Sequence, residues 1–334
     1  MDNKKLIISP SPHIYSGADT QTLMRDVLVA LLPAFVVSAL VYGQSVIAVT
    51  AVSVAVCVAT EWLIQRYLIK GPSTVGNLSA VVTGVLLAFN LPSDIPLWMV
   101  FVGAVAAIGV GKMSFGGLGR NPFNPALVGR VFMLISFPAA MTTFPDPLLP
   151  AGFDAVTGAT PLSALKEGLM SGAPLSEIVG QFSYRDLLLG IRSGSFGELS
   201  GLALLLGFAY LLIRRVITWR IPVYVLGSMA LMAALLWGVD PSRYADPLFH
   251  LLTGGAILGA VFMATDYATS PMNHRAMAIY AIGIGLLTMI IRTWGSYPEG
   301  MSFAILIMNA FVPLLGKYVK PSRFTRAAND KSSR

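Results

Sequence analysis

The chain has 334 residues, of which 55% are hydrophobic and only 12% are charged. Soluble domains carry about 25% charged residues, so this composition excludes an ordinary soluble protein and predicts an all-α, polytopic membrane protein. The formal net charge is +7, but the basic residues flank apolar segments, as they do at membrane surfaces. We therefore expect the lipid bilayer as a partner of the chain, and no nucleic acid.

About ten apolar segments follow one another along the chain, and each predicts a transmembrane helix. They lie at about 23–42, 46–64, 78–92, 96–111, 126–140, 199–213, 223–237, 248–265, 276–291 and 303–315. The third segment is shorter than the roughly 20 residues that a helix needs to cross the bilayer. The sequence thus predicts about ten spans.

Two groups of five spans flank a long polar segment. We expect a cytoplasmic N-terminal segment at 1–22, a first five-helix membrane repeat at 23–140, an extracytoplasmic loop at 141–198, a second five-helix membrane repeat at 199–316 and a basic cytoplasmic tail at 317–334. Thr83-Gly84 and Thr253-Gly254 lie in the third span of each group, and an odd number of spans inverts one group relative to the other. The pattern favours two inverted repeats; chance similarity between two apolar segments is the alternative.

The distribution of lysine and arginine predicts the orientation of the chain. With both termini in the cytoplasm, sixteen of these residues fall in inner segments and five in outer segments. Basic residues accumulate on the cytoplasmic side of a membrane protein. We therefore expect a multi-pass protein of the cytoplasmic (inner) membrane, with the 141–198 loop on the extracytoplasmic side.

The longest polar interruption contains the run Asp154-Ala155-Val156-Thr157-Gly158-Ala159-Thr160-Pro161. Gly158 and Ala159 leave little side-chain bulk beside Thr160, so another molecule can approach its hydroxyl closely. By itself the run also fits a surface turn, since Gly, Pro, Thr and Asp are common in turns.

Several runs together resemble one family of membrane redox proteins. Residues 154–160 are similar to the flavin-attachment motif Asp-x-x-Ser/Thr-Gly-Ala-Ser/Thr of that family. The runs 115–126, 194–198, 262–271 and 297–310 resemble further signatures of the same family. On these motifs the chain is identified as a member of the RnfD/NqrB family, and its length resembles that of the RnfD branch. The resemblance covers nearly the whole chain.

The resemblance implies a covalent cofactor. Thr160 matches the last hydroxyl of the motif and would carry FMN through a phosphoester bond, installed by a separate flavin transferase. Asp154, Thr157, Gly158 and Ala159 would be the residues that this transferase reads.

The family also implies a function in a complex. The chain would be the membrane flavoprotein subunit of an Rnf-type ferredoxin:NAD(+) oxidoreductase, relaying electrons across the membrane coupled to Na(+) or H(+) translocation. Its partners would be the other Rnf subunits, including a second subunit with covalent FMN and iron–sulfur subunits. The single cysteine, Cys57, cannot hold an iron–sulfur cluster, and we expect the NAD(+) and ferredoxin sites on other subunits and no metal site here.

The resemblance further implies a second, noncovalent flavin (riboflavin) nearer the cytoplasmic face. Asn121 and Asn124 lie in a glycine-rich run after the fourth span and could hydrogen-bond to it; the alternative is a tight turn that serves helix packing. Asp266, at the end of the eighth span, is a candidate for the ion pathway. Its alternative is a carboxylate that caps a backbone amide or pairs with Arg275.

Two other functions fit parts of the sequence. A secondary transporter or channel with inverted repeats would also contain broken spans, but it has no need of the motif around Thr160. A membrane scaffold without a cofactor is the other. Covalently bound flavin would separate both from the redox hypothesis.

Overall fold

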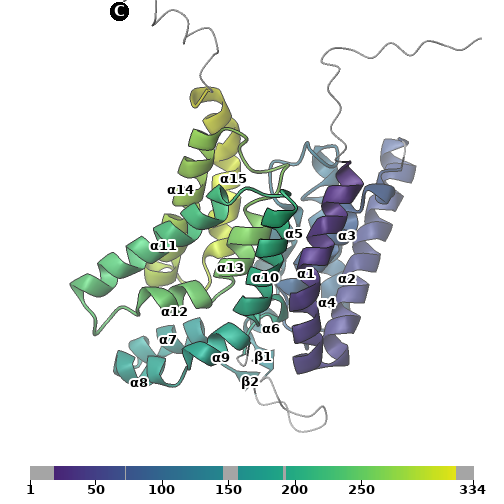
Figure 1. Ribbon diagram of the computed structural model, residues 1–334. Helices are drawn as coiled ribbons and strands as arrows, with labels where there is room; N and C mark the ends of the chain where they lie inside the picture. The colour runs from purple at the N-terminus through teal and green to yellow at the C-terminus, as the bar shows by residue number, and fades with distance from the viewer. Residues whose placement is uncertain (1–18, 72, 146–156, 191–192, 321–334) are drawn as a thin grey trace, which may run out of the picture.

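The computed structural model describes residues 19–71, 73–145, 157–190 and 193–320. In this part of the chain the fold is a bundle of helices running between two ends, with α1 beginning and α15 ending at the same end (Figure 1). Six helices are long and apolar enough to cross a membrane: Thr20–Tyr42, Gln44–Ile69, Leu97–Phe115, Arg220–Val239, His274–Trp294 and Met301–Tyr318. Three shorter apolar helices accompany them. The prediction of an all-α, polytopic membrane protein is confirmed.

The first half contains five apolar helices, each of which overlaps one predicted span. They are α1 (Thr20–Tyr42), α2 (Gln44–Leu63, continued by a π-helical turn to Ile69), α3 (Ser79–Phe89), α4 (Leu97–Gly109) and α5 (Pro125–Ser136). α2 packs against α3 and α4, and α4 packs against α5. Glycine permits the closest of these approaches, because a Cβ atom on Gly84 would lie 2.7 Å from the Cα atom of Val54.

The second half repeats this order of contacts. Its helices are α10 (Gly201–Ile213), α11 (Arg220–Val239), α12 (Pro247–Leu252), α13 (Ala256–Leu258, continued by a π-helical turn at Gly259–Met263), α14 (His274–Trp294) and α15 (Met301–Tyr318). α11 packs against α12 and α14, and α14 packs against α15. The order of contacts in this half matches that in the first half; the division into two inverted five-helix repeats stays a prediction.

The eighth span departs from the continuous helix predicted at 248–265. The helix stops at Leu252 and resumes at Ala256. Gly254 and Gly255 lie between the two parts with φ angles of 63° and 65°, in the left-handed region that glycine adopts without steric cost. Two consecutive glycines in this conformation end α12 and leave its last carbonyl groups without intrahelical partners.

The two halves meet along α1 and α10, which pack against each other. At their closest point a Cβ atom on Gly207 would lie 2.2 Å from the carbonyl oxygen of Ala30. Only glycine fits this crossing, so a larger residue would force the two helices apart.

A layer of short elements covers the end of the bundle opposite the start of α1 (Figure 1). It comprises α6 (Pro138–Thr142), the antiparallel pair of β1 (Phe144–Pro145) and β2 (Thr157–Gly158), α7 (Pro161–Met170), α8 (Leu175–Gly180) and α9 (Tyr184–Leu189). The sequence predicts this region only as a loop, because its helices are too short to show a sustained apolar period. Its apolar residues form a second small core with α12, comprising Leu162, Leu165, Leu175, Ile178, Leu187, Ala245 and Phe249.

Candidate functional site

Thr160 lies at the N-terminus of α7, in the layer of short elements. It is the N-cap residue: its Oγ1 accepts a hydrogen bond from the backbone N–H of Ser163 at 3.2 Å and donates one to the Ser163 hydroxyl at 2.9 Å. Pro161 follows at the first helical position, where a missing N–H costs nothing. Only 5% of Thr160 is exposed. Because threonine is a favoured N-cap residue and proline a favoured first helical residue, the sequence explains why α7 begins here and why this hydroxyl is held in place.

The structure describes part of the predicted attachment motif. Gly158 pairs with Phe144 in the two-stranded ladder and is half-buried, whereas Ala159 is exposed. The backbone of Thr157 belongs to β2; its side chain, and Asp154, lie outside the described residues. The two described residues that precede Thr160 directly, Gly158 and Ala159, therefore have little or no side-chain bulk.

A small cavity of about 30 Å³ adjoins Thr160. Its lining comes from α5, α6, β1, α7 and the loop before α15, and comprises Arg130, Leu134, Met141, Thr142, Phe144, Thr160, Ser163, Tyr297, Pro298 and Glu299. Arg130 and Glu299 form an ion pair in which the two side chains are 9% and 13% exposed. The guanidinium also donates to Asn90 Oδ1 at 3.0 Å and to Ser302 Oγ at 2.7 Å.

A larger cavity, of about 510 Å³, lies on the other side of α7. Its lining comprises Leu162, Leu165, Lys166, Leu169, Met170, Arg243, Tyr244, Ala245, His250, Arg292, Thr293, Trp294 and Pro298. Three of these residues are cationic, and Tyr244 and Trp294 add aromatic rings. Lys166 donates to the carbonyl oxygen of Gly295, and burial lowers the pKa of its ammonium group. The cavity thus combines apolar side chains, mostly from α7, with positive charge from Lys166 of α7 and from Arg243 and Arg292.

Arg292, at the end of α14, satisfies the carbonyl groups exposed by the break in the eighth span. Its guanidinium donates to the carbonyl oxygen of His250 at 2.7 Å and to those of Thr253 and Gly254 at 2.9 Å each. A cation at the C-terminus of α12 also complements the helix dipole. The broken helix is therefore stabilised by a residue from another helix, as buried irregular backbone in a membrane requires.

Replacing Arg292 with glutamine is expected to destabilise the protein by several kcal/mol. The three carbonyl groups are buried, and each one left without a donor costs about 1–3 kcal/mol. Thermal unfolding of the purified protein in detergent measures the effect. Arg243→Gln is the matched control, because Arg243 lines the same cavity but is exposed; equal melting temperatures for the two variants would contradict this role of Arg292.

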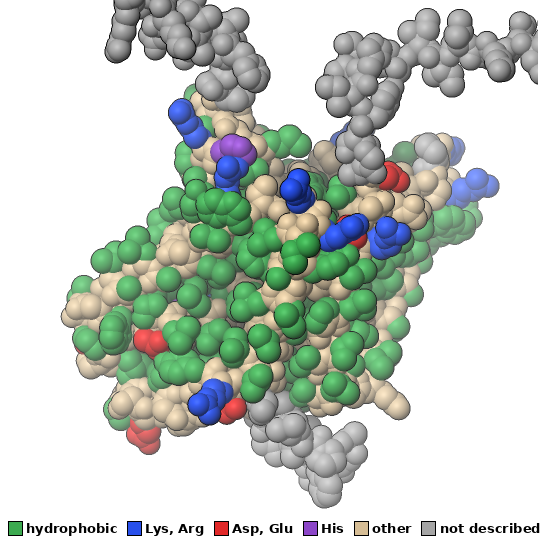
Figure 2. Space-filling model, viewed as in Figure 1, with side chains coloured by type: hydrophobic (Ala, Val, Ile, Leu, Met, Phe, Trp, Pro, Cys, Tyr) green, Lys and Arg blue, Asp and Glu red, His purple; other side chains and the backbone are tan. Residues whose placement is uncertain are grey.

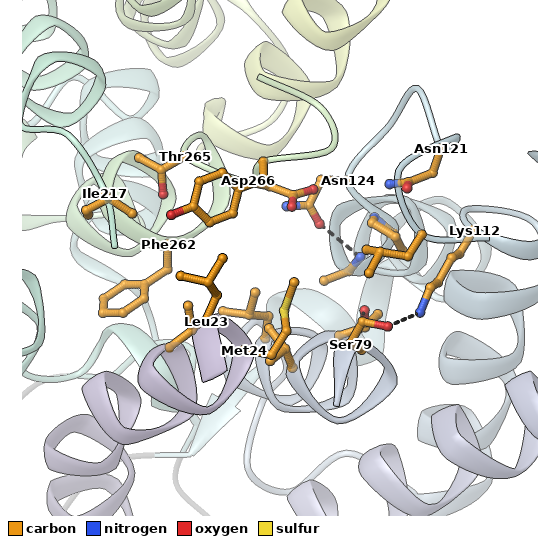
Figure 3. A pocket seen from close by; sticks show the side chains of 18 of the residues that line it. Leu23, Met24, Ser79, Lys112, Asn121, Asn124, Ile217, Phe262, Thr265 and Asp266 are labelled. Atoms are coloured by element: carbon orange, nitrogen blue, oxygen red, sulfur yellow. Dashed lines mark hydrogen bonds between the residues drawn. The ribbon is translucent and has the colours of Figure 1, made fainter. Parts of the chain in front are cut away.

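The three remaining predicted residues meet at the opposite end of the bundle. Asn121, Asn124 and Asp266 line one crevice together with Lys112 and Thr265, and its cavity measures about 70 Å³ (Figure 3). The start of α1, α3 and the turns after α4 and after the π-helical turn at 259–263 form its walls. The sequence contains no signal that would place Asp266 beside the two asparagines, because the residues are more than a hundred positions apart.

The amide groups of both asparagines are engaged with the backbone. Asn124 caps α5, accepting from Ala126 N–H at 3.0 Å, and donates to the carbonyl oxygen of Met263 at 3.1 Å. Asn121 accepts from Gly119 N–H at 3.2 Å and donates to the carbonyl oxygen of Phe123 at 3.0 Å. Such contacts with the backbone are typical of a tight turn, the alternative to a flavin contact given for this run in the sequence analysis.

Asp266 binds its own turn. Its carboxylate accepts from the backbone N–H of Ala268 at 3.5 Å and from the Thr269 hydroxyl at 3.2 Å. It forms no ion pair with Arg275 within the described ranges. The capping alternative therefore describes its contacts better than pairing with Arg275.

Lys112 and Glu61 form a buried ion pair that the sequence does not predict. Lys112 Nζ lies 2.5 Å from Glu61 Oε2 and donates to Ser79 Oγ at 2.6 Å, and the two charged side chains are 2% and 0% exposed. Glu61 also accepts from the Thr74 hydroxyl at 2.8 Å. The sequence does contain one indication of this pair, because an acid such as Glu61 inside an apolar span requires a partner. Lys112 follows α4, which packs against α2.

Comparison with known proteins shows the family to which the chain belongs. The model of the NQR2, RnfD, RnfE family matches residues 7–325. The D subunit of the Na(+)-translocating ferredoxin:NAD(+) oxidoreductase complex of Acetobacterium woodii is 47% identical over 96% of this chain and 95% of its own. The proton-translocating counterpart of Clostridium ljungdahlii is 41% identical over 95% of both chains, and the D subunit of an ion-translocating oxidoreductase complex of Alcanivorax borkumensis is 38% identical over 98% and 99%. With a match along nearly its whole length, the chain belongs to the NQR2, RnfD, RnfE family.

Proposed function

We propose that the chain is the D subunit of an ion-translocating ferredoxin:NAD(+) oxidoreductase complex, and that it carries covalent FMN on Thr160. The names of the relatives support the complex; they include a sodium pump and a proton pump, so the proposal is for cation translocation in general. The observation that carries the covalent flavin is the position of Thr160. Its hydroxyl is fixed at the N-terminus of α7 within the attachment motif.

The larger cavity beside α7 would hold the ring of a flavin attached to Thr160, which itself lines the smaller cavity. The 510 Å³ cavity beside α7 lies in the size range of small-molecule sites, roughly 300–1,000 Å³. Tyr244 and Trp294 offer ring surfaces at its edge, and Lys166 and Arg243 would favour negative charge on a bound ring. When bound, the flavin supplies one- and two-electron transfer, and the chain positions it and excludes water.

Attachment requires a reactive donor. The Thr160 hydroxyl loses its proton as a bond forms between Oγ1 and the flavin phosphorus. In the donor, an activated flavin nucleotide, the phosphoric anhydride bond breaks and the nucleoside phosphate leaves with the proton. The separate transferase would recognise Asp154, Thr157, Gly158 and Ala159, of which Ala159 is exposed.

The crevice at the opposite end is the proposed place of the second flavin, riboflavin. Asn121, Asn124 and Asp266 share this crevice, and two flavins at opposite ends of the bundle would suit a relay across the membrane. At about 70 Å³ the space is below the usual size of a small-molecule site, so ring entry requires Leu23 and Met24 to move. Asp266 remains the candidate for the ion pathway.

The orientation follows from the distribution of charge. On the face shown in Figure 2, most lysine and arginine side chains lie at the end where α1 begins and α15 ends. By the positive-inside rule this distribution supports a cytoplasmic location for this end, and Thr160 and α7–α9 would then lie on the extracytoplasmic side of the cytoplasmic membrane. The proposed partners are the other subunits of the complex, including a second subunit with covalent FMN and iron–sulfur subunits.

A secondary transporter is the second candidate, and the broken helix at Gly254 and Gly255 favours it, since broken spans line sites in such proteins. Ultraviolet fluorescence of the denatured protein on a gel separates the two functions. Produced together with the flavin transferase, the protein should give a fluorescent band; without the transferase it should stay dark. A dark band under both conditions, with the unmodified mass, would reject the covalent flavin.

A further inference from the structure

We propose that Arg130 neutralises the phosphodiester formed on Thr160, and that Glu299 gives up its ion pair with Arg130 when the flavin is attached. This inference rests on the proposed covalent flavin. It assigns a role in holding the cofactor to Arg130 of α5 and to the side chains that pair with it.

The position of Arg130 supports this role. Arg130 and Thr160 line the same cavity of about 30 Å³, and Arg130 is 7% exposed. Among the described residues that line this cavity, Arg130 is the single cation and Glu299 the single anion. Arg130 Nε has no hydrogen-bond partner in the described part of the chain, although it is buried. A guanidinium with spare donor capacity therefore lines the same cavity as the hydroxyl on which the phosphodiester would form.

The charge of the product explains why a cation is needed. A phosphodiester carries one negative charge at neutral pH, and a buried charge requires a partner of opposite sign. The N-terminus of α7, a helix of ten residues, contributes a partial positive charge and the N–H of Ser163. Arginine adds a full charge and the planar donor set that matches phosphate.

The network also indicates which residue yields. Arg130 is held by two neutral acceptors, Asn90 and Ser302, which do not depend on Glu299. Glu299 comes from the loop before α15, and its side chain is the more exposed of the pair. Once the phosphodiester is present, two anions compete for one cation. Glu299 can take up a proton or turn toward solvent, while the guanidinium stays in place.

Three variants test the inference: Arg130→Gln, Glu299→Gln and the double variant. Each is produced with the flavin transferase, and covalent flavin is measured as in-gel fluorescence per folded protein and as the mass of the peptide containing Thr160. Thermal unfolding of flavin-free protein reports the stability of the pair. We expect Glu299→Gln to retain its flavin, and Arg130→Gln and the double variant to lose about tenfold or more, as for a lost charge-assisted bond.

The double variant distinguishes a cofactor contact from a structural ion pair. Removing both charges leaves no buried charge unpaired, so the double variant should unfold close to the wild-type temperature. A double variant that is stable but poor in flavin supports the inference. Wild-type flavin content in the double variant, or equal flavin loss in Arg130→Gln and Glu299→Gln, overturns it. A dark wild-type band would instead reject the covalent flavin itself, so the two failures are distinguishable.

Discussion

Replacing Thr160 with valine is expected to abolish covalent flavin while the protein still inserts into the membrane. Valine has nearly the shape of threonine but lacks the oxygen on which the proposed phosphoester would form. The loss of the N-cap of α7 should cost only ~1 kcal/mol, which the long membrane helices tolerate. In-gel fluorescence and the intact mass measure the modification, and membrane fractionation measures insertion.

Thr160→Ser is the matched control, because it keeps the hydroxyl and the N-cap. It should stay fluorescent, with attachment slower or unchanged. Flavin retained in Thr160→Val would place the bond on a different hydroxyl, and Ser163, whose side chain lies 2.9 Å from Thr160 Oγ1, would be the next residue to replace. Ferredoxin:NAD(+) oxidoreductase activity of the assembled complex should fall with the covalent flavin.

Replacing Lys112 with methionine should destabilise the fold strongly, because it leaves the Glu61 carboxylate buried at 0% side-chain exposure without its cation. Breaking a buried pair from one side costs about 3–5 kcal/mol. At about 2 °C per kcal/mol the melting temperature should fall by roughly 5–10 °C. Thermal unfolding of the purified protein in detergent is the measurement.

The double variant Lys112→Met/Glu61→Gln should recover most of the lost stability, since replacing both charges is often neutral. Lys70→Met controls for the loss of a positive charge, because Lys70 is exposed, and it should melt close to the wild type. If Lys112→Met also melted there, the buried pair would contribute no stability.

Composition and apolar segments were enough to predict the fold class and the approximate position of each membrane element. They could not predict the break at Gly254, because hydropathy averaged along the segment does not show which glycines interrupt the helix. They also missed α7–α9, whose helices are stabilised by packing against α12 through residues such as Phe249. Short helices gain most of their stability from such tertiary contacts.

For the candidate site, the sequence pointed to Thr160 through its motif, and the structure adds its role as N-cap and the two adjoining cavities. It did not indicate which residues pair with Arg130 and Lys112, because those partners are 169 and 51 positions away. Asn121 and Asn124 were chosen as amides able to bind a ligand. The sequence does not show that both side-chain amides already form hydrogen bonds with backbone groups.

The crossing of α1 and α10 affects how the chain is made. α1 is the first helix to enter the membrane, yet the surface against which Ala30 packs belongs to the sixth membrane helix, with Gly207 at its centre. During synthesis this face of α1 therefore stays without its helix partner until α10, which ends at Ile213, has been made. Nascent chains arrested before that point should remain sensitive to proteases, and those arrested beyond it should gain protection.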